Sequence, residues 1–519
     1  MATSTQTIPD LSAALVTTPV PIAHWLVIAP VALCITLGAI LLMARGSVRL
    51  QAWLAIPGLA LLVALDAALL VKVMTDGPLT MVMGRWLPPF GIAFTVDTLS
   101  AVMALTAAIA ALSGGIHALG DIDDNNRRYG FFPFLLMLMA GVTGAFLTGD
   151  VFNLYVWFEV LLISSFGLLI LGSERRQIDG AMKYAVLNLL GTTLFLIAVG
   201  VLYAIFGTLN MADIATKAGA LGETAPLTTL AALFLLAFAM KAAAFPVNFW
   251  LPASYHTPRI VVSALFAGLL TKVGIYALIR VLVVLLPLER EELSLLIAIT
   301  GAATAILGAL GALAQDDVRK LLGYVVISGI GNMLIGIAVG TTGALSGTVF
   351  YALHSMLLMT ALYLAAGQMA FLGGSFSLTR LGGLYRRNGL FAAISLILFF
   401  AACGLPPFSG FWPKLILVKS TLDVGAWWLA AAVLASGFLT TICFGRVFLL
   451  AYWRPATESA ETYVAAGWRA MLPLLLLSSF VVGFGILPER LLALTQSVAT
   501  ELTDPYPYIE SVFPGGVAP

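Results

Sequence analysis

Long apolar runs separated by short polar or Pro/Gly-rich turns are the dominant pattern of this chain. Each run has about 20 residues, the length that an α-helix needs to cross the hydrocarbon core of a bilayer. The pattern predicts an all-α polytopic membrane protein with about fourteen transmembrane helices. Their expected starts lie near His24, Gln51, Val96, Tyr129, Val151, Ile178, Pro226, Thr257, Leu293, Leu321, Ala344, Asn388, Ala426 and Gly467. The segment from Gly77 to Phe94 is expected to lie at the membrane interface.

Two of the predicted helices, the seventh and the twelfth, carry proline in their interior. One break lies in residues 241–252 and the other in residues 404–414, and both contain a Phe-Trp pair. Proline removes a helical hydrogen bond and frees backbone carbonyls. A membrane tolerates such a break only where it is buried in protein or lines a wet cavity. Matching breaks in two halves of a chain indicate a transporter built from repeats.

The spacing of the breaks predicts the domain organisation. They fall five helices apart, which predicts two five-helix repeats formed by helices 4–8 and helices 9–13. An odd number of helices in each repeat inverts the second repeat relative to the first. The expected domains are residues 1–128 with helices 1–3, residues 129–286 and 287–455 with the two repeats, and residues 456–519 with helix 14 and a tail.

Composition supports the membrane class and excludes several functions. The chain is 61% hydrophobic and 10% charged, whereas a soluble domain carries about 25% charged residues. A formal net charge of +1 gives no sign of nucleic-acid binding. The three cysteines, Cys34, Cys403 and Cys443, form no CxxC pair, so we expect no disulfide framework, metal site or iron–sulfur site. The first residues lack the basic region of a cleavable signal peptide.

Basic residues in the turns predict the orientation. Turns after odd-numbered helices hold fourteen basic residues, including Arg127, Arg128, Arg386 and Arg387, whereas the opposite turns hold six. The positive-inside rule makes the first set cytoplasmic. Both termini are then expected on the extracytoplasmic side. The six are Lys72, Arg85, Lys217, Arg280, Arg290 and Arg490.

Five ionisable side chains fall inside the apolar runs: Glu159, Lys241, Lys272, His354 and Lys414. A charge near mid-bilayer costs about 2.5–3.5 kcal/mol on insertion scales, so such residues face the protein interior and usually serve transport. Histidine titrates near neutral pH, and water in the breaks can bridge distant groups. The row predicts a proton path, because a fixed ammonium repels sodium and no hard-cation ligand cluster is visible.

Each member of this row also has a structural explanation. Lys241 and Lys272 would then belong to buried ion pairs, and Glu159 would be a helix-end acid at the interface. His354 would be a core histidine bonded to a hydroxyl group, and Lys414 would extend to a surface.

Three further residues are secondary candidates. Lys419 is expected to extend to a surface. Asp66 could have a local ion partner or serve as an acid on a second path. Because it lies outside the repeats, we expect a structural role. His256 is expected to act as a gate or loop residue.

Several motifs are similar to one family. They are residues 236–280, the Asp150–Glu159 and Gly180–Tyr184 stretches, the Asp317–Tyr324 stretch, and the GFWPK run that ends at Lys414. They resemble the proton-translocating antiporter-like subunits, which include the large subunits of Mrp-type cation/proton antiporters and the membrane-arm subunits of respiratory complex I. Chain length, the helix 12 lysine and the short tail resemble the Mrp D-subunit branch most closely.

The resemblance implies roles for individual residues. It pairs Glu159 of helix 5 with Lys241 of helix 7, and it places Lys272, His354 and Lys414 along the same path. His256 departs from the family pattern, so no family role is carried over to it.

The resemblance also implies the assembly. We expect a complex with a large A-type subunit and small membrane subunits in a bacterial cytoplasmic membrane. The transported ions would be H⁺ and Na⁺ or another monovalent cation, and no cofactor is implied.

Three functions remain open from the sequence. The first is a module of a secondary cation/proton antiporter, which is a transporter and not an enzyme. The second is a proton-pumping subunit of a redox complex, such as complex I or a membrane hydrogenase. The third is a scaffold that binds partner subunits without transporting ions.

Overall fold

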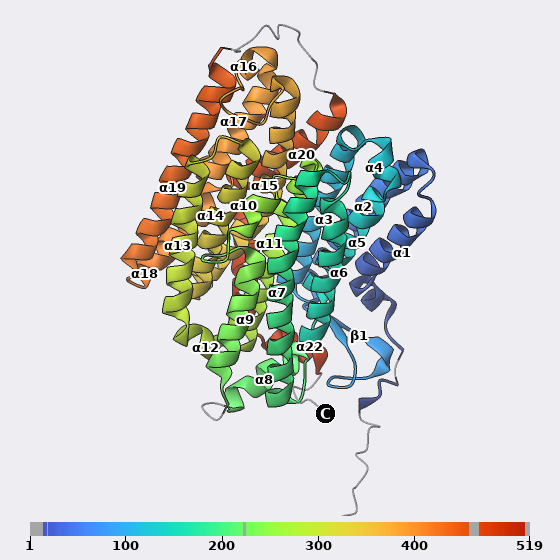
Figure 1. Ribbon diagram of the computed structural model, residues 1–519. Coiled ribbons are helices and arrows are strands. Elements are labelled where there is room, and N and C mark those ends of the chain that lie inside the picture. Colours follow the sequence, from blue (N-terminus) through green and yellow to red (C-terminus); the bar gives the residue numbers. More distant parts are fainter. Residues whose placement is uncertain (1–13, 18, 222–224, 456–466, 514–519) are drawn as a thin grey trace, which may run out of the picture.

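The computed structural model describes residues 14–17, 19–221, 225–455 and 467–513, which form a tall bundle of helices (Figure 1). Among the described residues, ten helices are long and apolar enough to cross a membrane, and four more apolar helices are shorter. Each predicted start lies close to the start of one of these helices. The largest difference is between His24 and Ala29, where α1 begins.

The apolar helices account for most of the bundle. They are α1 (Ala29–Met43), α2 (Val48–Asp76), α3 (Thr98–Asp121), α5 (Phe131–Leu147), α6 (Val151–Leu169), α7 (Arg175–Phe206), α9 (Leu227–Ala242), α11 (Ile260–Leu278), α13 (Ser294–Leu313), α14 (Val318–Val339), α15 (Thr342–Gly373), α17 (Gly389–Cys403), α19 (Trp427–Val447) and α20 (Trp468–Ile486). Two π-helices, η5 (Ile279–Leu285) and η6 (Phe448–Trp453), continue α11 and α19.

Shorter elements lie between these helices and at their ends. They are α4 (Asp124–Arg128), α8 (Met211–Leu221), α10 (Trp250–Ser254), α12 (Pro287–Glu292), α16 (Leu384–Arg387), α18 (Phe411–Asp423), α21 (Glu489–Thr503), α22 (Tyr506–Val512), and the 3-10 helices η2 (Ile22–Val27) and η3 (Met83–Arg85).

A small β-hairpin departs from the all-α prediction. β1 (Leu79–Val82) lies within the segment that was expected at the interface, and β2 (Ala93–Val96) extends two residues beyond it. The two strands pair antiparallel with Leu79 opposite Val96. The hydrophobic pattern missed it because each strand has only four residues, too few to show a clear period of two.

The two ends of the bundle carry different elements. Figure 1 shows α4 and α16 at one end, and α8, α12, α22 and the hairpin at the other. Both described ends of the chain meet the hairpin, because His24 Nδ1 lies 2.8 Å from the carbonyl oxygen of Thr80 and Ser511 Oγ lies 2.9 Å from Thr80 Oγ1. The first and last described segments therefore lie at the same end.

The central helices are fully enclosed. Every residue of α11 is buried, including Lys272. Arg280, which the sequence pattern placed in a turn, is instead buried in η5, where it forms an ion pair with Asp97 and donates to Ser100 Oγ at 2.9 Å. The apolar pattern missed this pair because the residues are far apart in the chain.

Two aspartates, the buried Asp150 and the half-buried Asp317, cap α6 and α14 in different electrostatic surroundings. Asp150 accepts from Asn153 N at 2.7 Å at the start of α6, and Asp317 accepts from Arg319 N at 2.9 Å at the start of α14. Burial raises the pKa of Asp150 to about 6, against the opposing hydrogen bonds from the backbone. Burial would also raise the pKa of Asp317, but the hydrogen bonds and charge of Arg319 hold it below its usual value.

Replacing Asp150 with asparagine is expected to increase the stability of the protein more at pH 8 than at pH 4.5, relative to the wild-type protein at the same pH. Because its folded-state pKa is raised, the contribution of Asp150 to stability is complete below its unfolded value and is lost as pH rises through about 6. The full difference is worth about 3 kcal/mol. Asparagine still caps the helix. Thermal unfolding of both proteins at the two pH values measures the effect.

Asp317→Asn is the matched control for that experiment. It removes a carboxylate that binds Arg319, so it should lower the unfolding midpoint at pH 8. If Asp150→Asn and Asp317→Asn changed the unfolding midpoint equally at each pH, this would contradict the raised pKa of Asp150.

Candidate functional site

The first break separates α9 from α10 and lies directly after Lys241. Lys241 is the next-to-last residue of α9. Pro246 lies four residues after Ala242 and has no amide hydrogen to donate to its carbonyl. The amide of Phe245 also leaves the helical pattern and donates to Thr304 Oγ1 at 2.9 Å. The end of α9 therefore presents backbone carbonyls beside a buried lysine.

The ammonium of Lys241 is held by the backbone of a neighbouring helix. Its Nζ donates to the carbonyl oxygen of Asn188 in α7 at 2.9 Å and lies 5.8 Å from the ring centroid of Phe158 in α6. Glu159, the next residue of α6, is half-buried. Among the ion pairs of the described residues, none joins Glu159 to Lys241 within 4.0 Å. The expected partners are neighbours here but not in contact.

Lys272 occupies the middle of the enclosed helix α11. Its Nζ donates to the carbonyl oxygen of Ala267 at 2.6 Å. Two residues further on, Gly274 packs so closely on Ala242 that an added Cβ would lie 2.9 Å from the Ala242 amide nitrogen. Lys272 therefore lies near the junction of α11 with the first break.

A tight seam between α11 and α15 connects the level of Lys272 to that of His354. At Gly268 an added Cβ would lie 2.2 Å from Thr360 Oγ1 and 3.0 Å from the Met356 carbonyl oxygen. The two helices run antiparallel. Lys272, one turn after Gly268 in α11, therefore lies at about the depth of the turn before Met356 in α15, which is close to His354. Lys272 and His354 therefore lie at similar depth in the bundle.

His354 contacts the second break directly. Its Nδ1 lies 2.7 Å from Ser409 Oγ, in the segment between α17 and α18. His354 also lines a small polar cavity of ≈ 10 Å³. This is about the space that the centre of one water molecule needs. The cavity walls include His354, Lys414, Ser328, Asn332, Tyr351 and Thr440.

Lys414 replaces the hydrogen bonds that the second break removes. Its Nζ donates to the carbonyl oxygens of Ala402 at 3.2 Å and Cys403 at 2.8 Å. In a continuous helix these carbonyls would accept from residues four positions later, which here are Pro406 and Pro407 and have no amide hydrogen. An ammonium with several donors is suited to this task.

The two breaks share one backbone hydrogen-bond pattern. Ala244 N donates to the carbonyl of Ala239 at 2.9 Å, and Leu405 N donates to that of Phe400 at 3.0 Å. Both helices then end, at Ala242 and Cys403. The same geometry therefore recurs at both sites.

This common pattern places the two lysines on opposite sides of their breaks. Lys241 lies before the first break, and the residue that occupies the same position before the second break is Ala402. Lys414 lies after the second break, where the first has Ala253. The broken helices correspond, but the lysines do not.

The Phe-Trp pairs are also out of register. Trp250 corresponds to Phe411, so the pairs are shifted by one residue. Their indoles differ as well, because Nε1 of Trp250 donates to Met240 O at 3.0 Å whereas Nε1 of Trp412 donates to Gly485 O at 2.9 Å.

The secondary candidates lie outside this row. His256 lies between α10 and α11, where its Nδ1 is 2.8 Å from the Pro252 carbonyl oxygen, and burial lowers its pKa. Lys419 is exposed. Asp66 is fully buried in α2, and within the described part of the chain neither carboxyl oxygen has a hydrogen-bond partner. The expected ion partner of Asp66 is therefore absent from the described residues.

Sequence reasoning missed two residues that contact the row and one further buried histidine. Asn188 acts through its backbone carbonyl, which leaves no side-chain signal. Ser409 is one of many serines, and only the fold brings it to His354. His117 in α3 is buried, and its Nδ1 has no partner among the described residues; its position in an apolar run was an available signal.

The described residues hold no cluster of three or more His, Cys, Asp or Glu side chains that could bind a metal ion. The three cysteines are buried and free.

Comparison with known families finds one match that covers more than half of the chain. Residues 148–440 match the transmembrane family described as NADH:quinone oxidoreductase/Mrp antiporter. The matched region begins just before α6 and ends within α19, so it includes both breaks and all five residues of the row.

Curated relatives align over nearly the whole chain. The D subunit of the Na(+)/H(+) antiporter of Alkalihalophilus pseudofirmus is 35% identical over 487 residues, which cover 94% of this chain and 99% of the relative. The corresponding D subunit of Bacillus subtilis is 36% identical over 444 residues, which cover 86% of this chain and 90% of the relative.

Solved structures share the fold. A chain of the Mrp complex from Dietzia sp. superposes with a TM-score of 0.88 at 28% identity, covering 95% of this chain and 100% of that one. A chain of respiratory complex I from Thermus thermophilus superposes with a TM-score of 0.79 at 25% identity, covering 92% and 99%.

Proposed function

Because the chain belongs to the NADH:quinone oxidoreductase/Mrp antiporter family and is a subunit of a multisubunit cation/proton antiporter, we propose that it conducts the protons. The resemblance inferred from the motifs, to antiporter D subunits, is confirmed by these relatives. The path would run along Glu159, Lys241, Lys272, His354 and Lys414. The observation that carries the proposal is the placement of three lysines and a histidine at or between two helix breaks, each held by backbone carbonyls or a hydroxyl group.

The proton path follows from what holds each group. Lys241 and Lys414 donate to carbonyl oxygens, which stabilise the ammonium without neutralising it. The nearby Glu159 adds a movable negative charge that favours the protonated form of Lys241 when it approaches. His354 contacts Ser409 and lines the small cavity, so it can exchange a proton with either of them. A proton that leaves one group changes the field at the next.

We propose that the protein crosses the membrane fourteen times with two inverted repeats. The first repeat would comprise α5, α6, α7, α9 with α10, and α11, within residues 129–286. The second would comprise α13, α14, α15, α17 with α18, and α19, within residues 287–455. Residues 1–128 and 456–519 would flank them.

Matching contacts support this division beyond the breaks. Ser165 Oγ lies 2.9 Å from Tyr184 Oη between α6 and α7, and Asn332 Nδ2 donates to Tyr351 Oη at 3.4 Å between α14 and α15. Both first helices of these pairs have an aspartate cap, and both last helices of the units end in a π-helix.

We further propose a bacterial cytoplasmic membrane location with both termini extracytoplasmic. The arginine-bearing helices α4 and α16 both lie at one end of the bundle, and both described chain ends lie at the other (Figure 1). A large A-type subunit and small membrane subunits would complete the complex, and Na⁺ or another monovalent cation would pass through a sister subunit.

The alternative is a redox-driven proton pump, which the similarity to complex I and to an archaeal sulfane sulfur reductase supports. Proteoliposomes that contain the purified complex separate the two functions. We expect an imposed sodium gradient to drive proton movement without NADH or quinone. Proton movement that requires an electron donor, and no response to any monovalent cation gradient, would exclude antiport.

A further inference from the structure

A second cluster of charge lies at one end of the bundle, far along the chain from the lysine row. The start of α2, the end of α3 with α4, and the start of α20 enclose a groove of ≈ 870 Å³. Four arginines line it: Arg49, Arg127, Arg128 and Arg469. The only acidic residue in its lining is Asp124. The groove therefore carries an excess of positive charge.

The protein leaves most of this charge available. Arg49, Arg128 and Arg469 are exposed. Asp124 lies 3.5 Å from Nη1 of Arg127, and within the described residues this is the one ion pair that any of the four arginines forms. An anion in the groove would meet several unneutralised guanidinium groups, which bind phosphate in a bidentate manner.

Two of the arginines are held in place by the end of α3. Nη2 of Arg127 donates to the carbonyl oxygen of Leu119 at 2.8 Å, and Nη1 of Arg469 donates to the same oxygen at 3.1 Å. This shared acceptor brings Arg127 and Arg469 together although they are distant in the chain. Nε of Arg127 is buried and has no partner among the described residues.

The other walls of the groove are apolar. They include Trp53, which is 77% exposed, Trp468, which is 62% exposed, and Ile56 and Pro57. Tryptophan is enriched at the level of lipid headgroups. A free phosphate ion would fill the basic end and leave these walls uncovered, whereas a phospholipid has both a phosphate and an acyl chain. The combination of basic and apolar walls favours a lipid.

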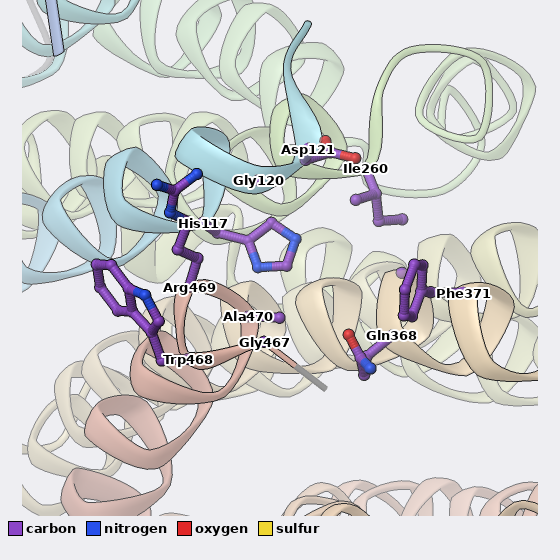
Figure 2. A pocket seen from close by; sticks show the side chains of 11 residues that line it. His117, Gly120, Asp121, Ile260, Gln368, Phe371, Gly467, Trp468, Arg469 and Ala470 are labelled. Carbon is purple, nitrogen blue, oxygen red and sulfur yellow. The ribbon is translucent and has the colours of Figure 1, made fainter. Parts of the chain in front are cut away.

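A neighbouring cavity shows which side of Arg469 faces the groove. This cavity of ≈ 390 Å³ shares Trp468 and Arg469 with the groove and is also lined by His117 and Gln368. Figure 2 shows the imidazole of His117 directed into that cavity, whereas the guanidinium of Arg469 points away from Gln368. The charge of Arg469 is therefore directed away from the smaller cavity.

We propose that the groove binds an anionic phospholipid. Its phosphate would lie between Arg127 and Arg469, and its acyl chain would lie against Trp53 and Trp468. Basic pockets between helices on the cytoplasmic side of a membrane are suited to such headgroups. The lipid would join α2, α3 and α20, which come from the N-terminal and C-terminal parts of the chain. The binding does not depend on the proton path.

The test measures lipid binding to the purified complex in detergent, by native mass spectrometry and by the unfolding midpoint Tm. Added phosphatidylglycerol should bind and raise Tm, and phosphatidylcholine should not. R127Q/R469Q should weaken phosphatidylglycerol binding about thirtyfold, as expected for two lost basic contacts. Because Arg127 also caps α3, R49Q/R128Q is a second variant whose exposed side chains can be changed without loss of fold.

A control variant changes arginines outside the groove. R386Q/R387Q removes two arginines of α16, outside the groove, and should leave binding unchanged. Equal phosphatidylglycerol binding by the wild-type protein, R127Q/R469Q and R49Q/R128Q would overturn the proposal. So would an equal rise of Tm with inorganic phosphate alone, or the finding that an acidic segment of a neighbouring subunit covers the groove and no lipid binds.

Discussion

Lys272→Met is expected to abolish proton movement and to leave the protein at least as stable as before. Lys272 is fully buried, and within the described part of the chain its ammonium has one hydrogen bond, to the carbonyl of Ala267 in its own helix. An uncompensated buried charge is costly, so a methionine of similar length should not lower the midpoint of thermal unfolding. Loss of this proton carrier should reduce the rate of cation-driven proton uptake about a hundredfold or more.

The opposite directions of the two effects make this variant informative. If Lys272 served only the fold, its removal would lower stability and leave transport of the surviving complexes intact. The measurement therefore pairs the unfolding midpoint with cation-driven proton uptake on the same preparation. An unfolding midpoint several degrees lower would contradict the account of its burial.

Lys414→Arg is expected to keep the second break intact and to stop transport. Arginine keeps the positive charge and the donors for the carbonyls of Ala402 and Cys403, which Pro406 and Pro407 cannot supply. It does not release a proton at any physiological pH. The complex should therefore assemble with little change in unfolding temperature, while proton uptake falls about a hundredfold.

Lys419→Arg provides a matched control on the same helix. Lys419 is exposed and lies five residues after Lys414. The same substitution there should leave both stability and proton uptake at wild-type levels. Lys414→Met adds a further comparison, because it removes the donors as well and should lower the unfolding midpoint. Wild-type uptake by Lys414→Arg would show that Lys414 only closes the break.

Much of the architecture was predictable because it rests on local patterns. Apolar runs of span length gave the starts of the apolar helices to within a few residues. Proline marked both breaks because its effect on a helix is local. The hairpin of β1 and β2 was missed because four-residue strands carry too little pattern.

The site was predictable in its residues and not in its contacts. Charged side chains in apolar runs are visible in any sequence, so the five members of the row could be named. Their partners could not, because the Asn188 carbonyl that holds Lys241 is a backbone group and Ser409 reaches His354 only through the fold. The Phe-Trp pairs were visible in the sequence, but only the backbone hydrogen bonds of the two breaks show that these pairs are shifted by one residue relative to each other.

The shared hydrogen-bond pattern of the two breaks changes how the two lysines are compared. Lys241 and Lys414 lie on opposite sides of equivalent breaks, so each has a different set of freed carbonyls beside it. Lys241 donates across to α7, and Lys414 donates back to α17. We infer that the two sites hold their protons by different contacts, although the helices that carry them correspond.

We propose that protons pass along the row of lysines and the histidine. The most direct measurement is sodium-driven proton uptake by proteoliposomes that contain the intact complex, with wild-type protein, Lys272→Met and Lys419→Arg compared at equal subunit content. We expect proton uptake at the wild-type rate for Lys419→Arg and a rate about a hundredfold lower for Lys272→Met. Uptake by an intact Lys272→Met complex at the wild-type rate would contradict it.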